Sequence, residues 1–304
     1  ISNCLVENTT ITADQSCEYI DANKAGNAGE IVGRNTKNID LSSNRAVNVT
    51  VVGTYFSVES NEEVENALDK NDKHIFIELK SDVSIDVNAW ETLAFGGDKT
   101  ETITIEGNKH TITFNHLNPD WNNIATANGA KLIINNATIT NSGKNDGPWN
   151  RHDLNFACDV ELNNVISNKA IALKAAATLN KVTISDNNTS DTYAIWIQPK
   201  GQKVVLNECT IDMLSCTDGR GIKIDEQYVG APAKVTLNIN GADFNTKKKA
   251  AIMVKSAAGA EINVSNVDIT GVAADTVNAV WVDADSAAHA DKVVVNGATK
   301  FQEQ

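Results

Sequence analysis

Apolar and polar residues alternate in a short segment that recurs five times in the second half of the chain. Each copy has a small residue, a branched aliphatic residue, a variable residue, a second branched residue and a polar residue. The copies begin at Ala170, Ala194, Gly221, Ala251 and Ala279. Alternation with a period of two predicts a β-strand that buries one of its faces.

Stacking the five copies in one register predicts two columns of side chains. The inward column is expected to contain Ile171, Ile195, Ile222, Ile252 and Val280. The outward column is expected to contain Ala172, Trp196, Lys223, Met253 and Trp281. Because neighbouring strands lie about 4.8 Å apart, the outward side chains are expected to share one sheet face.

A second strand pattern ends in an apolar residue that Asn follows in most copies. Its apolar residues are Ile105, Ile134, Leu162, Leu179, Leu206, Ile239, Val264 and Val295. The spacing varies from 17 residues (Leu162 to Leu179) to 33 residues (Leu206 to Ile239). Asn at a fixed turn tolerates a left-handed backbone and can hydrogen-bond its equivalents in neighbouring coils.

Fixed strands joined by loops of variable length predict a right-handed parallel β-helix over residues 54–304. In this pattern the segment resembles the pectate-lyase-like β-helix superfamily, which implies aliphatic ladders inside and insertions at the corners. A β-sandwich is the alternative, with hairpin turns such as Asn-Gly between even strands. Asn240-Gly241 and Asn296-Gly297 instead fall in register with the repeat, which favours the β-helix.

Residues 1–53 are predicted to form a separate unit. The run Gly29-Glu30-Ile31-Val32-Gly33 is similar to the end of the glycine-rich GLUG-type repeats of bacterial surface proteins. That resemblance implies a chain cut from a longer, repetitive cell-surface protein, and hence an extracellular or cell-surface location.

Residues 58–68 have a helical pattern instead. Ser60 can cap a helix whose first turn is acidic, and Val64, Ala67 and Leu68 have a spacing of three and four. A solenoid has apolar ends that must be covered. We therefore expect one short helix that caps the first coil.

Composition narrows the possible partners. The net charge of −13 argues against a nucleic-acid binder, which needs a basic surface. No stretch reaches the roughly 20 apolar residues of a membrane helix, so membrane insertion is not expected. The chain is expected to be a monomer without a cofactor. Its cysteines (Cys4, Cys17, Cys158, Cys209 and Cys216) favour small buried thiols over a disulfide pair.

The predicted outward column is the first candidate site. An exposed Trp196 or Trp281 can stack on a sugar ring or anchor a protein partner. The alternative is that a long loop folds over this face and buries both indole rings.

The second candidate is the corner loop over residues 145–156, which is rich in functional side chains. Leu154 and Phe156 fit the inward column, so their neighbours are expected to point outward. A polar recognition pocket is one interpretation, and an Arg–Asp pair that fixes the loop is the other. The candidate ligand-binding residues are Trp149, Arg151, His152, Asp153 and Asn155.

The third candidate is the run from Cys216 to Tyr228. Arg220, Ile222 and Lys223 are similar to the Arg-Ile-Lys motif of polygalacturonases, which implies contact with a uronate carboxylate. The acid and base carboxylates of that family are missing from the expected places. If the chain is an enzyme, the candidate catalytic residues are His152, Asp153, Arg220, Lys223 and Asp225.

No metal site is expected. Asp225 and Asp283 are predicted to lie two strands apart, about 9.6 Å, which is too far for one calcium ion. Lys255 is expected between them, as the middle of an Asp–Lys–Asp ladder.

Three functions are compatible with these patterns. The favoured one is a non-catalytic, adhesin-like module of a bacterial surface protein that binds a glycan or a host surface protein. The others are a lyase or glycoside hydrolase acting on an acidic polysaccharide, and a structural spacer. An enzyme needs two titratable groups about 5–9.5 Å apart in an open cleft, which an adhesin or a spacer does not need.

Overall fold

The structure is a computed structural model. It describes residues 5–7, 10–12, 45–47, 50–87, 93–116, 123–142, 154–185, 193–214, 220–227, 229–246, 252–266, 268–270, 282–284 and 292–297. Two short parallel pairs occur near the N-terminus: β1 (Leu5–Glu7) with β3 (Arg45–Val47), and β2 (Thr10–Thr12) with β4 (Thr50–Val52).

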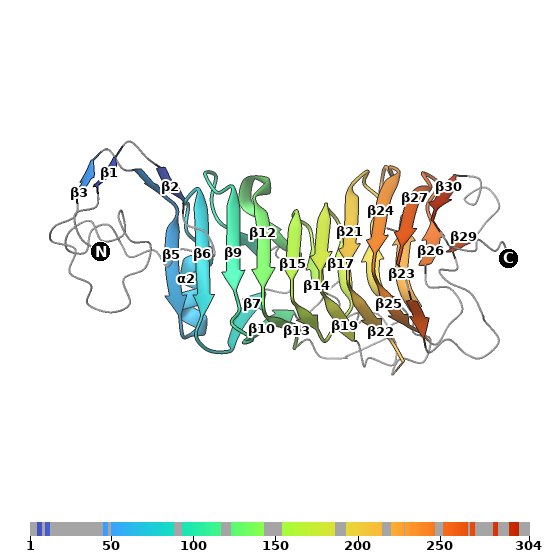
Figure 1. The fold of residues 1–304 in the computed structure, drawn as a ribbon, viewed down its shortest axis with the longest axis horizontal. Coiled ribbons are helices and arrows are strands. Elements are labelled where there is room, and N and C mark those ends of the chain that lie inside the picture. The colour runs from blue at the N-terminus through green and yellow to red at the C-terminus, as the bar shows by residue number, and fades with distance from the viewer. Residues whose placement is uncertain are drawn as a thin grey trace.

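From residue 54 onward the chain forms a right-handed parallel β-helix, as the strand patterns predict (Figure 1). Each coil passes in turn through three parallel sheets, which we call sheets 1, 2 and 3. Among the described residues, sheet 1 has ten strands and sheets 2 and 3 have eight each.

Sheet 1 contains β5 (Thr54–Val58), β6 (His74–Leu79), β9 (Thr102–Glu106), β12 (Lys131–Asn135), β15 (Val160–Asn163), β18 (Ala177–Asn180), β21 (Lys203–Asn207), β24 (Val235–Asn240), β27 (Ala260–Ser265) and β30 (Val293–Asn296). Sheet 2 contains β7 (Val83–Val87), β10 (Thr111–His116), β13 (Thr138–Asn141), β16 (Ile166–Ser167), β19 (Thr183–Ser185), β22 (Thr210–Asp212), β25 (Asp243–Asn245) and β28 (Asp268–Thr270). Sheet 3 contains β8 (Leu93–Phe95), β11 (Ile124–Thr126), β14 (Leu154–Phe156), β17 (Ile171–Leu173), β20 (Tyr193–Ile197), β23 (Arg220–Asp225), β26 (Ile252–Lys255) and β29 (Val282–Ala284).

The core is a set of aliphatic columns, because the inward residue of each strand lies over its equivalent in the next coil. In sheet 3 one column contains Leu154, Ile171, Ile195, Ile222 and Ile252, all fully buried. In sheet 1 the column predicted from Ile105 to Val264 has the predicted register throughout.

The last coil differs from the prediction by two residues. In sheet 3, Ile252 pairs with Val282 instead of Val280, and in sheet 1, Val295 pairs with Ile262 instead of Val264. The predicted registers of Val280 and Val295 are therefore wrong. A shift of two residues keeps the same side chains facing inward, so the alternating pattern fits both registers equally well.

Asparagine side chains hydrogen-bond from coil to coil along sheet 1, as predicted. Asn163 donates to Asn135, Asn180 to Asn163, and Asn207 to Asn180, with N···O distances of 2.7–2.8 Å. The left-handed residue is the one that follows each of these asparagines. It is Asn136, Asn164, Lys181 or Glu208, each with φ near +50°.

Helix α2 (Asn61–Leu68) confirms the predicted short helix. The Ser60 hydroxyl accepts a hydrogen bond from the Glu63 N–H at 3.3 Å, and Val64, Ala67 and Leu68 are buried. The helix packs on the first coil, against β5, β6 and β7, at the end of the solenoid (Figure 1). No helix in the described part of the chain is both long and apolar enough to cross a membrane.

Candidate functional site

The outer face of sheet 3 brings several candidate residues into one column. Asn155, Ala172, Trp196, Lys223 and Met253 are paired in this order through consecutive strands. The next position is Asp283, so Trp281 does not occupy it as predicted.

This column is buried. Trp196 is 6% exposed and Lys223 is 8% exposed. The Lys223 ammonium forms a 2.5 Å ion pair with Asp225 and lies 5.2 Å from the ring centre of Tyr193 and 5.6 Å from that of Trp196. Lysine thus contributes an ion pair and two cation–π contacts to a packed layer. The Trp196 indole is therefore not open for stacking on a sugar.

The other candidate residues are placed less completely. Trp149, Arg151, His152, Asp153 and Trp281 lie outside the described residues. Arg220 begins β23, where its backbone pairs with that of Tyr193.

The predicted Asp–Lys–Asp ladder is wrong in its last step. Lys255 lies opposite Asp225, but the two-residue shift of the last coil puts Asp283 opposite Met253. Asp225 instead pairs with Lys223 on its own strand. Among the residues that the structure describes, no cluster of three or more His, Cys, Asp or Glu side chains could hold a metal ion.

Two cysteines lie in the described part of the chain, and both are buried free thiols, in agreement with the buried-thiol interpretation. Burial raises the pKa of Cys158 to about 12 and that of Cys209 to about 11. Neither thiol has the thiolate character that nucleophilic catalysis requires.

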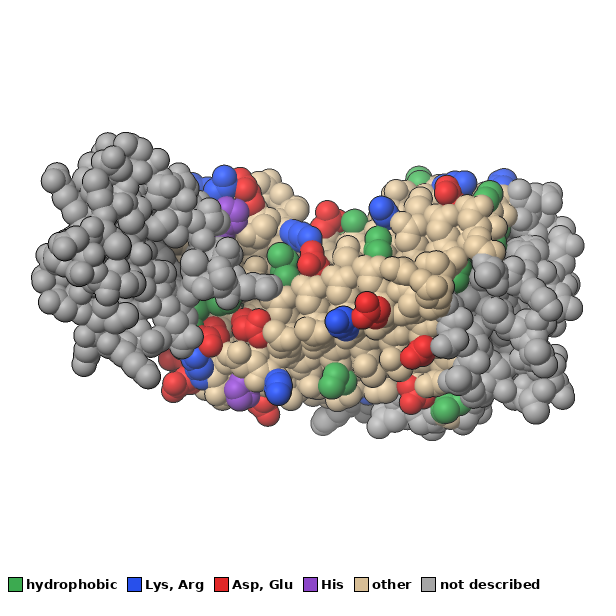
Figure 2. Space-filling view, viewed as in Figure 1, with side chains coloured by type: hydrophobic (Ala, Val, Ile, Leu, Met, Phe, Trp, Pro, Cys, Tyr) green, Lys and Arg blue, Asp and Glu red, His purple; other side chains and the backbone are tan. Residues whose placement is uncertain are grey.

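An open depression lies on sheet 1, where two successive corners are short. Residues 157–159 join β14 to β15, and residues 174–176 join β17 to β18. The corners on either side are longer: residues 127–130 contain the 3-10 helix η1 (Ala127–Gly129), and residues 198–202 precede β21. The surface is therefore hollowed over the middle coils (Figure 2).

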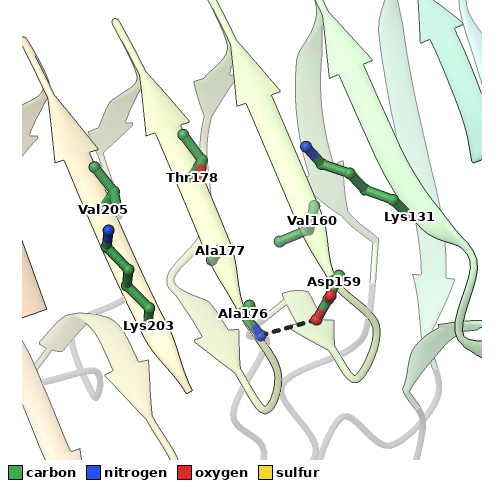
Figure 3. A pocket seen from close by; sticks show the side chains of 8 residues that line it. All are labelled: Lys131, Asp159, Val160, Ala176, Ala177, Thr178, Lys203 and Val205. Carbon is green, nitrogen blue, oxygen red and sulfur yellow. Dashed lines mark hydrogen bonds between the residues drawn. The ribbon is translucent and has the colours of Figure 1, made fainter. Parts of the chain in front are cut away.

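The depression has a volume of about 280 Å³. The side chains at its floor are small. Ala176 lies directly before β18, and Thr178 lies on β18. Lys131 stands on one side, on β12, and Lys203 and Val205 stand on the other, on β21 (Figure 3). The remaining lining residues are Asp159, Val160 and Ala177.

The charges of the depression are arranged unevenly. The Lys131 ammonium is 2.5 Å from the Glu161 carboxylate, and this hydrogen bond lowers the pKa of Glu161 despite the opposing effect of burial. Asp159 is exposed and accepts a hydrogen bond from the Ala176 N–H at 3.1 Å through one oxygen. Lys203 is exposed and forms no ion pair with the described residues.

The wall that carries Lys203 is internally braced. Gln202 donates to the Gln198 carbonyl at 2.7 Å and accepts from the Lys200 N–H at 2.8 Å. The Ala233 N–H, in the corresponding corner of the next coil, donates a hydrogen bond to the Pro199 carbonyl at 3.1 Å. These bonds hold the backbone before β21 in place without using the Lys203 side chain.

The depression is not evident from the sequence, because Ala176 and Thr178 have no charged or catalytic side chain. The available signal was the 17-residue interval between Leu162 and Leu179, the shortest in the repeat. A short coil leaves short corners, and longer neighbouring corners then rise beside it.

Comparison of the chain with protein-family models, with curated proteins and with solved structures found no match. The structure therefore assigns the chain to an architecture, the parallel β-helix.

Proposed function

We propose that the chain is a non-catalytic carbohydrate-binding module of a bacterial cell-surface protein, and that the depression on sheet 1 is its ligand site. The observation that carries this proposal is the lining of the depression. A hydroxyl group (Thr178), a carboxylate (Asp159), two ammonium groups and small apolar side chains surround about 280 Å³. Ligand sites combine apolar surface with a few polar groups in this way, at about 300–1,000 Å³ for drug-sized ligands.

The hydrogen bonds of the carboxylates in and beside the depression support binding over glycoside hydrolysis. A hydrolase needs one carboxyl group that remains protonated until it donates to the leaving group. The lowered pKa of Glu161 keeps this residue ionised near neutral pH, and its partner is Lys131. One oxygen of the Asp159 carboxylate already accepts a hydrogen bond from the Ala176 N–H.

The cell-surface assignment draws on two features. The run from Gly29 to Gly33 is similar to GLUG-type repeats, and the fold is similar to that of the pectate-lyase-like superfamily, in which corners line binding faces. A structural spacer is the second candidate, favoured by the unbroken aliphatic columns of the core. A spacer needs no ligand, so a binding experiment separates the two.

The test is a screen of the protein against a glycan array and a panel of soluble polysaccharides. Thr178→Trp fills the floor of the depression, and Thr183→Trp adds the same bulk in the same coil on the outer face of sheet 2. We expect the parent and Thr183→Trp to bind one glycan class and Thr178→Trp to lose that binding.

The same samples are assayed for new reducing ends and for the absorbance of unsaturated uronates. Turnover of any polysaccharide would contradict the non-catalytic assignment. Equal binding by both Trp variants would place the ligand elsewhere, and no binding to any glycan would leave the spacer as the better function.

A further inference from the structure

We propose that the depression selects one anionic sugar residue, whose carboxylate or sulfate group pairs with Lys203 while Asp159 accepts hydrogen bonds from its hydroxyl groups. This inference rests on the proposed function and adds the chemistry of the ligand to it. It assigns a specificity-determining role to Lys203, which stood out in no sequence motif.

The two lysines that line the depression differ in their carboxylate partners. Of the two lysines that line the depression, Lys131 is already neutralised by Glu161 at 2.5 Å. Lys203 has no carboxylate partner in the described structure, although the protein carries a net charge of −13. An unneutralised ammonium beside a depression favours an oxyanion, and charged hydrogen bonds are about twice as strong as neutral ones.

Asp159 and Lys203 stand on opposite sides of Ala176 in the depression (Figure 3). Asp159 directly precedes β15 and Lys203 begins β21, at the same edge of sheet 1, with Ala176 between them (Figure 3). The backbones of Asp159 and Lys203 are two strand spacings apart, which is about 9.6 Å. One sugar ring with its anionic substituent spans such a distance. Its hydroxyl groups then lie near Asp159, and its charge lies near Lys203.

The depression is short along the solenoid axis. Along the solenoid axis its lining ends at Lys131 on β12 on one side and at Lys203 and Val205 on β21 on the other. The space of about 280 Å³ therefore suits a single terminal or branching residue better than a polymer running along the axis. Val205 and Ala176 offer an apolar surface to one side of that residue.

The test uses oligosaccharides with one shared neutral core, carried in three forms: unmodified, sialylated and sulfated. Binding is measured by calorimetry for the parent, Lys203→Ala, Lys203→Arg and Lys200→Ala. Lys200→Ala removes the same charge from the neighbouring corner, and Lys200 does not line the depression. Melting temperatures verify that all variants are folded.

We expect at least one anionic form to bind more tightly than the neutral core. Lys203→Ala should weaken that form by about tenfold to a hundredfold, as expected for loss of a charged hydrogen bond. Lys203→Arg should retain most of the affinity, Lys200→Ala should match the parent, and the preferred form distinguishes a carboxylate ligand from a sulfate ligand.

Equal affinity for the neutral and anionic forms, or an unchanged affinity in Lys203→Ala, would overturn this inference. If Thr178→Trp still abolished that binding, the proposed function would survive without the anionic preference. Binding that neither substitution affects would overturn both proposals.

Discussion

At the scale of single residues, Glu78 provides a measurable link between pH and stability. Burial raises its pKa, but hydrogen bonds from Lys80, Tyr55 and Asn108 outweigh that effect and lower the pKa from 4.5 to about 2. A lowered folded-state pKa contributes stability that is present above about pH 4.5 and is lost as the pH falls toward 2. The loss is at most about 3 kcal/mol, since each pKa unit corresponds to about 1.4 kcal/mol.

The prediction is that Glu78→Gln removes this part of the acid dependence. Urea unfolding of the parent should show a steeper fall in stability between pH 4.5 and pH 2.5 than unfolding of Glu78→Gln. Glu101→Gln is the control, because Glu101 is 59% exposed and pairs only with an exposed lysine in the described structure. Parallel curves for the parent and Glu78→Gln would refute the role given to these hydrogen bonds.

At the scale of the element, the hydrogen-bonded asparagines of sheet 1 form a ladder from Asn135 to Asn207. An asparagine in the middle of this ladder should contribute more to stability than the one at its start. Asn180→Ala removes the acceptor of Asn207 and the donor to Asn163, so it should lower the free energy of unfolding by about 1–3 kcal/mol. Asn135→Ala should cost less than about 1 kcal/mol, because the Asn135 amide nitrogen has no partner and Asn163 keeps its bond to Glu161. Chemical denaturation measures both, and equal losses would be evidence against a continuous ladder.

The repeat could be aligned from sequence wherever each coil is anchored by an apolar residue before the turn. From Ile105 to Val264 this anchor fixed the register of sheet 1, and Ser60 fixed the start of the helix. Only the last coil was misplaced, because Val280 and Val282 both satisfy the alternation. Choosing between them depends on corner geometry, which alternation does not encode.

At the scale of the whole molecule, alternation predicts which side of a sheet a residue faces but not what lies over that side. Trp196 faces outward as predicted and is nevertheless buried. The depression has the converse origin, because it depends on the relative heights of neighbouring corners. Lys203 becomes a candidate only when the corners of four coils are compared in space.

The stacking of coils also predicts which strands a core substitution destabilises. Ile222 is fully buried within the column that runs from Leu154 to Val282, whereas Val294 faces outward on the last described strand of sheet 1 and is 45% exposed. Ile222→Asp should cost more than about 4 kcal/mol by burying an unpaired charge, and Val294→Asp should cost less than about 0.5 kcal/mol. Because each coil contacts only its neighbours, amide exchange in Ile222→Asp should accelerate first in β20, β23 and β26. Wild-type exchange in these strands, or comparable melting of the two variants, would contradict the inward position of Ile222 and the continuity of the core.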